Sequence, residues 1–320
     1  MLIATPGLGA ALAANTPVRL IVPVPPGGGM DVTARVLAER LRQVLGTVIV
    51  ENKPGASLRL GIQAVRAAAA DGSVLLYAPT SPFTIFPHVY PQLGYDAEAD
   101  FIPIASTASF EFALSTSTES GIDSVDKFLE RARTDPNRFG LYGVPGVGTG
   151  AHFVGAALAQ ATGVELTNIP YRGSAPLIQD LLGGQIVAAC NVLGEFTAAY
   201  SAKKLNVLAT TGRSRSSLMP DVPTFAELGL PNLVFDEEFG LFAPKGTPTE
   251  LIQRLSSTVR QALGDQEVQR RFFDRGYFVR AMDSDELARK LAEDRKRWGP
   301  IVKKTGFSLS SSEEVIKRGQ

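Results

Sequence analysis

The chain has 320 residues, enough for two lobes of ordinary domain size, and its 44% hydrophobic and 20% charged residues are typical of a soluble globular protein. Its 32 basic residues balance its 32 acidic residues, which argues against nucleic acid or a membrane surface as the partner. One cysteine (Cys190) excludes an internal disulfide and a cysteine-based metal cluster, and two histidines (His88 and His152) leave little for a zinc site or a histidine-based triad.

The N-terminal residues 1–16 resemble the remnant of an export signal. Residues 1–14 are small and apolar, and Ala11-Leu12-Ala13 is similar to a signal-peptidase site. A complete secretory signal begins with basic residues, whereas the first basic residue here is Arg19. We therefore interpret the segment as an incomplete export signal, with a disordered apolar N-terminus as the alternative. No run is long enough to span a bilayer.

The first third of the chain alternates strands with helices. Strands are predicted at residues 20–24, 48–51 and 74–78, and helices at residues 31–45 and 61–70. This βαβαβ order predicts a parallel sheet with right-handed crossovers.

A glycine loop joins the first strand to the first helix. Its sequence is Pro25-Pro26-Gly27-Gly28-Gly29-Met30-Asp31. Glycines leave backbone N–H groups open, and a helix capped by Asp31 adds the positive end of its dipole, so the loop is typical of a small anion site. It is not a nucleotide-binding P-loop, since no Gly-Lys-Ser/Thr follows. The alternative is a tight turn that binds nothing.

The middle of the chain repeats the pattern and predicts a second sheet. Strands are expected at residues 112–116, 139–142, 166–171, 186–191 and 207–211, and helices at residues 124–133, 150–163 and 174–182.

A second glycine loop, Gly143 to His152, joins a strand of this sheet to a helix. Gly146-x-Gly148-x-x-Ala151 formally matches a dinucleotide fingerprint, which would make the chain an NAD-dependent oxidoreductase. Pro145 interrupts the strand before the first glycine, and we favour a second anion site with the Thr149 hydroxyl as a donor. His152, in the first turn of the helix, is either a ligand contact or structural.

Further candidates follow other predicted strands, where open parallel sheets bind ligands. Thr80 and Ser81 offer hydroxyls, or form a plain turn. Arg172 could pair with a ligand carboxylate or with Asp180. Asn191 and Glu195-Phe196 follow the next strand as contacts, or as a polar edge and a helix cap.

Two expectations concern residues near these candidates. Asp236-Glu237-Glu238 is expected to be a solvated loop, with a carboxylate that selects an amino or hydroxyl group of the ligand as the alternative. Phe83, Phe86 and Phe196 are core residues or line an apolar wall.

The tail differs from the rest, with a strand at residues 239–243 and helices at residues 249–263, 267–275 and 284–298 that could return to the first lobe. Two α/β lobes with such a return suggest a ligand cleft between them. We find no Gly-x-Ser-x-Gly and no acid/base pair of carboxylates, which favours a binding protein.

These segments together resemble the extracytoplasmic solute-binding proteins of tripartite tricarboxylate transporters, also called the Bug family. The likeness extends over nearly all of residues 17–310. The segments that carry it are Pro25–Arg35, Val50–Ala56, Tyr142–His152, Pro170–Pro176, Asp180–Gln185, Asp221–Gly229 and Ala243–Pro248.

The resemblance implies an α/β, two-lobe periplasmic-binding-protein fold (type II-like) that closes on a small organic acid. We expect residues 17–115 with 238–320 to form lobe 1 and residues 116–237 to form lobe 2. The family also implies a periplasmic location, two integral membrane transporter subunits as partners, and neither enzymatic activity nor a metal or cofactor; a monomer is the default. The candidate ligand-binding residues are Pro26, Gly27, Gly28, Asp31, Thr80, Ser81, Gly148, Thr149, His152, Arg172 and Asn191.

The chain departs from the family pattern at two places. Ser57-Leu58-Arg59-Leu60 precede Gly61, so Arg59 reaches the cleft or faces solvent. Glu237-Glu238 stand where the family usually has Trp before a Phe-Gly pair, which leaves the ligand class open. A carboxylate-sensing module with a different membrane partner is a further alternative.

Overall fold

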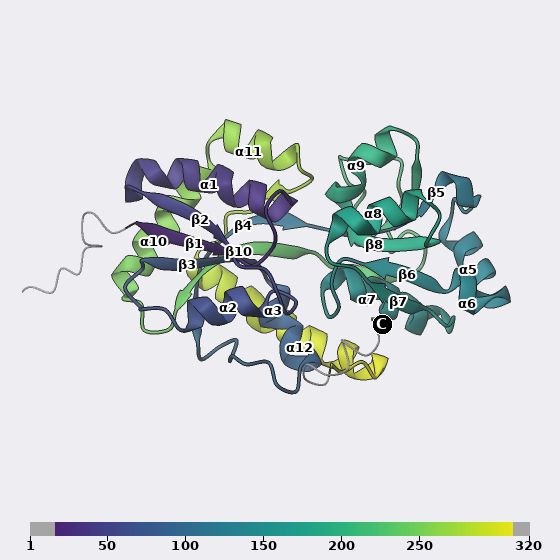
Figure 1. Cartoon of the computed structure of the whole chain (residues 1–320), viewed down its shortest axis with the longest axis horizontal. Helices are drawn as coiled ribbons and strands as arrows, with labels where there is room; N and C mark the ends of the chain where they lie inside the picture. Colours follow the sequence, from purple (N-terminus) through teal and green to yellow (C-terminus); the bar gives the residue numbers. More distant parts are fainter. Residues whose placement is uncertain (1–16, 310–320) are drawn as a thin grey trace, which may run out of the picture.

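The computed structural model describes residues 17–309, so the expected export-signal remnant lies outside the described residues. Two β-sheets with helices packed against them lie side by side along the long axis of the molecule (Figure 1). The first is six-stranded, with order β11-β4-β10-β3-β1-β2. Its strands are β1 (Val18–Val22), β2 (Val48–Asn52), β3 (Val74–Pro79), β4 (Phe101–Phe110), β10 (Glu237–Pro244) and β11 (Phe278–Val279).

The first sheet combines parallel and antiparallel strands. β1 pairs in parallel with β2 and β3, as the βαβαβ pattern predicts, whereas β10 runs antiparallel to both β3 and β4. Its helices are α1 (Gly29–Leu45), α2 (Arg59–Arg66), α3 (Ser81–Thr84), α4 (Phe86–Val89), α10 (Thr249–Leu263), α11 (Gln266–Phe273) and α12 (Ser284–Thr305).

The second sheet is five-stranded, with order β7-β6-β8-β5-β9. Its strands are β5 (Phe112–Ser117), β6 (Leu141–Val144), β7 (Thr167–Pro170), β8 (Ala188–Val192) and β9 (Leu205–Thr210). Its helices are α5 (Val125–Thr134), α6 (Pro136–Phe139), α7 (Gly150–Thr162), α8 (Ser174–Leu182) and α9 (Leu193–Ser201), with the short 3-10 turns η1 (Thr118–Ser120) and η2 (Pro231–Leu233). β5 is antiparallel to both of its neighbours, β8 and β9.

Two chain segments connect the sheets. β4 continues into β5 with only Glu111 between them, and the chain returns at the start of β10 (Figure 1). The lobe boundary expected at residues 115–116 therefore lies inside β5, and the one expected at residues 237–238 lies inside β10, whose pairing with β4 begins at Glu237.

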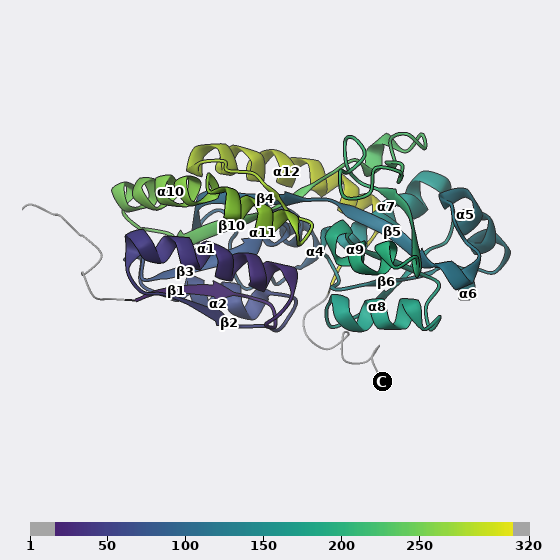
Figure 2. The same cartoon turned by 90° about the horizontal axis from the view of Figure 1, so that it is seen from above.

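The last helix lies along the first sheet and reaches the second (Figure 2). α12 extends past its predicted end at Trp298 to Thr305 and includes Pro300. The Trp298 ring lies 5.4 Å from that of Phe153 on α7 and 5.0 Å from that of Phe235. Between residues 17 and 309, every helix is too short or too polar to span a bilayer.

An aromatic cluster forms part of the core beside the first sheet. The ring of Phe83 stacks on Phe242 at 4.0 Å and meets the edge of Phe101 at 5.4 Å. Phe83, Phe86 and Phe196 are all fully buried, so they belong to the core and do not line an open wall.

We expect Phe83→Ala to lower the free energy of unfolding by about 3–5 kcal/mol, because the substitution removes a fully buried ring and leaves a cavity. Urea unfolding followed by circular dichroism measures this change. Val44→Ala on the exposed side of α1 is the control and should change stability by less than about 0.5 kcal/mol. Equal effects of the two substitutions would contradict this account of the core.

Candidate ligand-binding site

The first glycine loop is closed by the side chain of Asp31. α1 begins at Gly29 with Gly28 as its N-cap, two residues earlier than predicted, so Asp31 lies inside the first turn. Its carboxylate accepts hydrogen bonds from the Gly27 N–H at 2.9 Å, from Asn52 Nδ2 at 2.8 Å and from Arg35 Nη2 at 2.9 Å. Asp31 therefore holds the loop from behind and does not serve as the helix cap.

The pKa of Asp31 agrees with its role as the residue that holds the loop. Burial favours a raised pKa for Asp31, but the hydrogen bonds from Arg35, Gly27 and Asn52 lower the pKa below its ordinary value. The carboxylate is thus ionised at neutral pH, with its oxygens occupied by donors of the protein.

The tip of the same loop is open. Pro26, Gly27 and Gly28 are exposed, and a Cβ added at Gly27 or Gly28 would meet nothing within 4 Å. Gly27 has φ +96°, a left-handed conformation that glycine adopts without strain. The backbone of Pro26–Gly28 is therefore the part of this loop that a ligand can reach.

A carboxyl group of the second lobe approaches the start of α1. The side chain of Glu195, on α9, is placed near the N–H of Gly29, and Glu195 Oε1 lies 3.4 Å from the Tyr277 hydroxyl. Burial raises the pKa of Glu195 although the Gly29 N–H and Tyr277 partly oppose the shift. From the sequence, Glu195 follows the same strand as Asn191, with a helix cap as the alternative to a ligand contact, and it is not among the candidate ligand-binding residues.

The second glycine loop is closed in the same way by His152. Gly148 has φ +82° and donates its N–H to Nδ1 of His152 at 3.2 Å, four residues on, as Gly27 does to Asp31. Because Nδ1 accepts, the proton of the neutral ring is on Nε2. The side-chain Nδ2 of Asn168 lies 3.1 Å from it and is also a donor, so Nε2–H donates to Asn168 only when the amide is turned to present its oxygen. Burial lowers the pKa of His152 to about 4, so the ring is neutral. Both ring nitrogens are used internally, which makes His152 a support of the loop.

The start of α7 also receives a carboxyl group of the protein. The Gly150 N–H donates to Oε1 of Glu237 at 3.1 Å, and a Cβ at residue 150 would lie 2.4 Å from that oxygen. Thr149, the N-cap, donates its hydroxyl to the Gly146 carbonyl at 2.8 Å and makes no side-chain capping bond. The prediction of a solvated loop at Glu237-Glu238 is wrong, since both residues lie in β10 and are 5% and 0% exposed.

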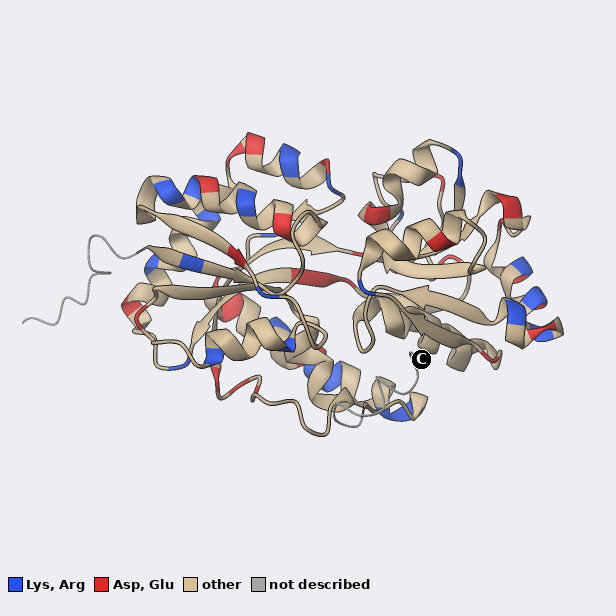
Figure 3. Ribbon diagram, in the orientation of Figure 1, with Lys and Arg blue, Asp and Glu red and all other residues tan. Residues whose placement is uncertain are grey.

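Figure 3 shows this acidic start of β10 between the two sheets. Burial raises the pKa of Glu237 to about 8, and hydrogen bonds from Ser81 and Gly150 only partly oppose it. Ser81 is the first residue of α3, beside the first sheet, and Gly150 is the first residue of α7, beside the second sheet. Glu237 is therefore a point at which predicted site segments from both sheets meet.

Other contacts bring the second glycine loop against the first lobe. A Cβ at Gly148 would lie 3.3 Å from Val89 and 3.7 Å from Tyr90, at the end of α4. The guanidinium of Arg59 lies 4.3 Å from the centre of the Tyr90 ring. Thr80, which is buried, binds β10 through its N–H to the Glu238 carbonyl at 2.9 Å.

Asn191 and Arg172 lie in the second lobe. Asn191 is fully buried, and its Oδ1 accepts from the Val192 N–H at 2.9 Å and from the Ser174 hydroxyl at 3.3 Å. Its Nδ2 has no partner within residues 17–309. Arg172 is exposed, and Asp180, its alternative partner, accepts from the Tyr171 hydroxyl instead.

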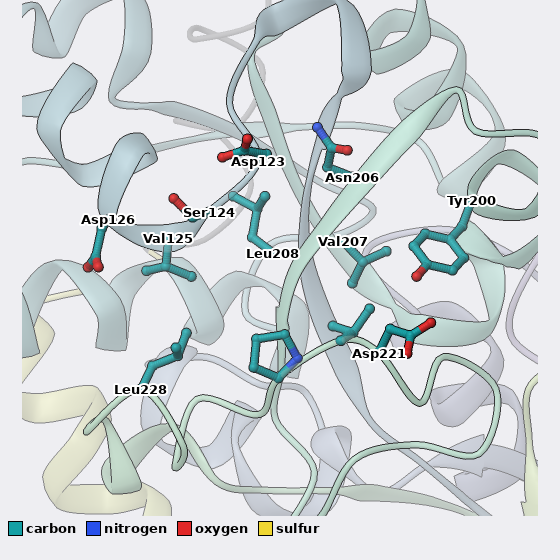
Figure 4. A pocket seen from close by; sticks show the side chains of 12 residues that line it. Asp123, Ser124, Val125, Asp126, Tyr200, Asn206, Val207, Leu208, Asp221 and Leu228 are labelled. Carbon is teal, nitrogen blue, oxygen red and sulfur yellow. The ribbon is translucent and has the colours of Figure 1, made fainter.

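Two hollows on the surface lie away from the glycine loops. A cavity of about 280 Å³ is lined by twelve residues, of which three are acidic, Asp123, Asp126 and Asp221; Tyr200 and Leu228 also line it (Figure 4). Another, of about 450 Å³, lies between His88 and the end of α12. Neither contains a predicted ligand residue. Within the described part of the chain, no group of three or more His, Cys, Asp and Glu side chains is placed to hold a metal ion.

Comparison with known proteins identifies close relatives. A family model described as "Tripartite tricarboxylate transporter family receptor" matches residues 33–307. Protein BugT of Bordetella pertussis is 33% identical over 313 residues, which cover 96% of each chain.

Solved structures match over most of their length. The periplasmic binding protein BugD has a TM-score of 0.83 at 30% identity, covering 92% of this chain and 99% of BugD. R. palustris Rpa4515 with adipate has a TM-score of 0.86 at 30% identity, with coverage of 92% and 99%. MatC from Rhodopseudomonas palustris with bound malate has a TM-score of 0.82 at 27% identity, with coverage of 89% and 98%. The predicted two-lobe periplasmic-binding-protein fold is confirmed.

The buried His152 predicts a pH-dependent stability. Its pKa is about 4 in the folded protein and about 6.5 when unfolded, so the unfolded state binds a proton between these values. The stabilisation is complete above pH 6.5 and is lost as the pH falls towards 4. Between pH 7 and pH 5 we expect a loss on the order of 2 kcal/mol from this group.

The test compares the wild type with His152→Asn, which keeps an acceptor near Gly148 but does not titrate. Urea unfolding at pH 7, 6 and 5 should give a smaller loss of stability for the variant. Parallel pH dependences for the two proteins would contradict a buried neutral His152.

Proposed function

The chain belongs to the tripartite tricarboxylate transporter receptor family, and we propose that it captures a small organic acid in the periplasm for the integral membrane subunits of such a transporter. Adipate and malate, the acids in the titles of two solved relatives, are both carboxylates. The protein is a solute-binding protein, and its role in transport needs no chemical step.

The observation that carries the proposal for this chain is the buried amide nitrogen of Asn191. An unpaired buried donor costs about 1–3 kcal/mol, so such groups usually meet a partner in the functional state. Asn191 is bonded to Ser174, the first residue of α8, where backbone N–H groups and the helix dipole favour an anion. A ligand carboxylate would satisfy the amide and use the positive end of the helix.

The remaining candidate residues are of two kinds: those that contact the ligand and those that hold the glycine loops in place. We propose that the ligand meets the exposed backbone of Pro26–Gly28 and the segment Gly148–Thr149, with Thr80 and Ser81 close to the second loop and Arg172 at the edge. Asp31 and His152 act from behind the two loops, because their acceptor atoms are engaged by loop N–H groups.

The oxidoreductase alternative is disfavoured by Glu237. A dinucleotide places its pyrophosphate on the N–H groups at the start of the helix after the glycine fingerprint. Here the Gly150 N–H is bonded to a carboxyl oxygen, whose negative charge, when present, would repel a phosphate. The sensory alternative shares the ligand and differs only in the membrane partner. We infer that the protein acts as a monomer.

We expect mono-, di- or tricarboxylates in a thermal-shift screen at neutral pH to raise the melting temperature. A ligand that binds only the folded protein at 100 times its Kd adds about 2.7 kcal/mol of stability. NAD should leave the temperature unchanged, whereas saturable NAD binding would support the oxidoreductase. If no acid shifts the melting temperature, the carboxylate proposal fails.

Asn191→Leu should lower the affinity for the best acid at least about tenfold, because the amide donor is lost at nearly constant volume. Isothermal titration calorimetry measures this loss. Asn206→Leu, at an asparagine of the same sheet that lines the acidic cavity of Figure 4, is the control and should bind normally. Unchanged affinity in Asn191→Leu would remove Asn191 from the site.

A further inference from the structure

We propose that Glu237 makes this site select an organic acid that carries a hydrogen-bond donor, an ammonium or a hydroxyl group, in addition to its carboxylate. The inference rests on the proposed function and names the ligand class within it. It takes up the alternative that the sequence left open for Asp236-Glu237-Glu238, a carboxylate that selects an amino or hydroxyl group of the ligand.

Glu237 lies where the predicted binding segments converge. It is the first residue of β10, at the return of the chain to the first sheet, and only 5% of it is exposed. Its Oε1 accepts the N–H of Gly150, next to Thr149, and Ser81 bonds to the same carboxyl group from the other lobe. A ligand held between the β3–α3 loop and the second glycine loop would therefore meet this carboxyl group.

Glu237 has no cationic partner, in contrast to its neighbour. Glu238, on the same strand, lies 3.3 Å from Arg280 Nη1 and 3.4 Å from Lys290 Nζ. Within residues 17–309 no lysine or arginine forms an ion pair with Glu237, and the charged groups that act on it, Glu238 and Asp294, are both acidic. Buried carboxylates are normally paired or protonated. Burial without a cation raises the pKa of Glu237 to about 8, so the group is mostly neutral at pH 7, and a donor group of the ligand compensates the ionised form.

The need for a donor group near Glu237 distinguishes between acids of the same chain length. A plain dicarboxylate brings a second negative group and no donor, so it can accept a hydrogen bond from protonated Glu237 but is repelled by the ionised form. An acid with an ammonium group supplies both donors and positive charge, and one with a hydroxyl group supplies a donor alone. The carboxylate of either acid remains available for Asn191 and the helix start beside it.

The pH dependence of binding separates the two kinds of donor. An ammonium group needs ionised Glu237, whose pKa of about 8 means that affinity falls as the pH falls below 8. A hydroxyl group bonds to either form, so its affinity changes little. The titratable groups around this point are Glu238 on β10, Asp294 on α12, Glu111 beside the paired strand β4, and His152 on α7, which is neutral above about pH 4.

Calorimetry with matched acids tests the inference. Each set has the same chain length: succinate, malate and aspartate; glutarate, 2-hydroxyglutarate and glutamate; adipate, 2-hydroxyadipate and 2-aminoadipate. In at least one set we expect the hydroxy or amino acid to bind at least tenfold more tightly than the plain diacid. Titrations at pH 6, 7 and 8 then identify the donor.

Glu237→Gln should reduce this preference at least tenfold, because the carboxyl acceptor and its charge are lost while the shape is kept. Asp236→Asn is the matched control: it removes an acidic charge one residue earlier, from a side chain paired with Arg280 at 2.7 Å, and should keep the preference. Circular dichroism checks that both variants fold. If Glu237→Gln does not fold, the preference of the wild type for the substituted acids over the plain diacid tests the inference alone.

A plain diacid that binds as tightly as its substituted partners, or a preference that survives Glu237→Gln, would overturn the role of Glu237 and leave the proposed function intact. If none of the acids binds the wild type, the proposed function itself fails.

Discussion

The arrangement of the two lobes depends on carboxyl groups that meet helix N-termini across the junction between the sheets. Glu237 accepts the N–H of Gly150 at the start of α7, and Glu195 lies at the start of α1, close to the Gly29 N–H. Each contact joins segments far apart in the chain. Burial raises the pKa of both carboxyl groups above that of an exposed acid, so protonation changes the charge at this junction at a higher pH than it would in water.

The two glycine loops are built by the same local device. In each, a glycine with positive φ donates its N–H to a side chain four residues later, Asp31 in the first loop and His152 in the second. An ionised carboxylate and a neutral imidazole thus perform the same task. The device fixes the loop from behind and leaves the backbone of its other face for a ligand, as recognition of a carboxylate by main-chain donors requires.

The kind of ligand depends on the groups of the site that are not already hydrogen-bonded within the protein. In the exposed first loop the Gly28 N–H is the available main-chain donor, because Pro26 has no N–H and that of Gly27 is bonded to Asp31. Within residues 17–309, Asn191 has a buried amide donor without a partner, and Glu237 has a carboxyl group without a cationic partner. The acid proposed above, with a carboxylate at one end and a donor group near the other, supplies an acceptor for Asn191 and a donor for ionised Glu237.

The sequence by itself determined the local elements and the family. Alternating strands and helices, the glycine loops at their joints and the ordered motifs predicted the two-lobe fold and placed Gly27, Gly148 and Asn191 at strand ends, because these features depend on residues close together in the chain. Only the tertiary structure decided the roles of Asp31, His152, Glu195 and Glu237. Gly150 and Glu237 are 87 residues apart, and whether a carboxyl group is solvated or buried against a helix start depends on how the lobes pack, which no local pattern encodes.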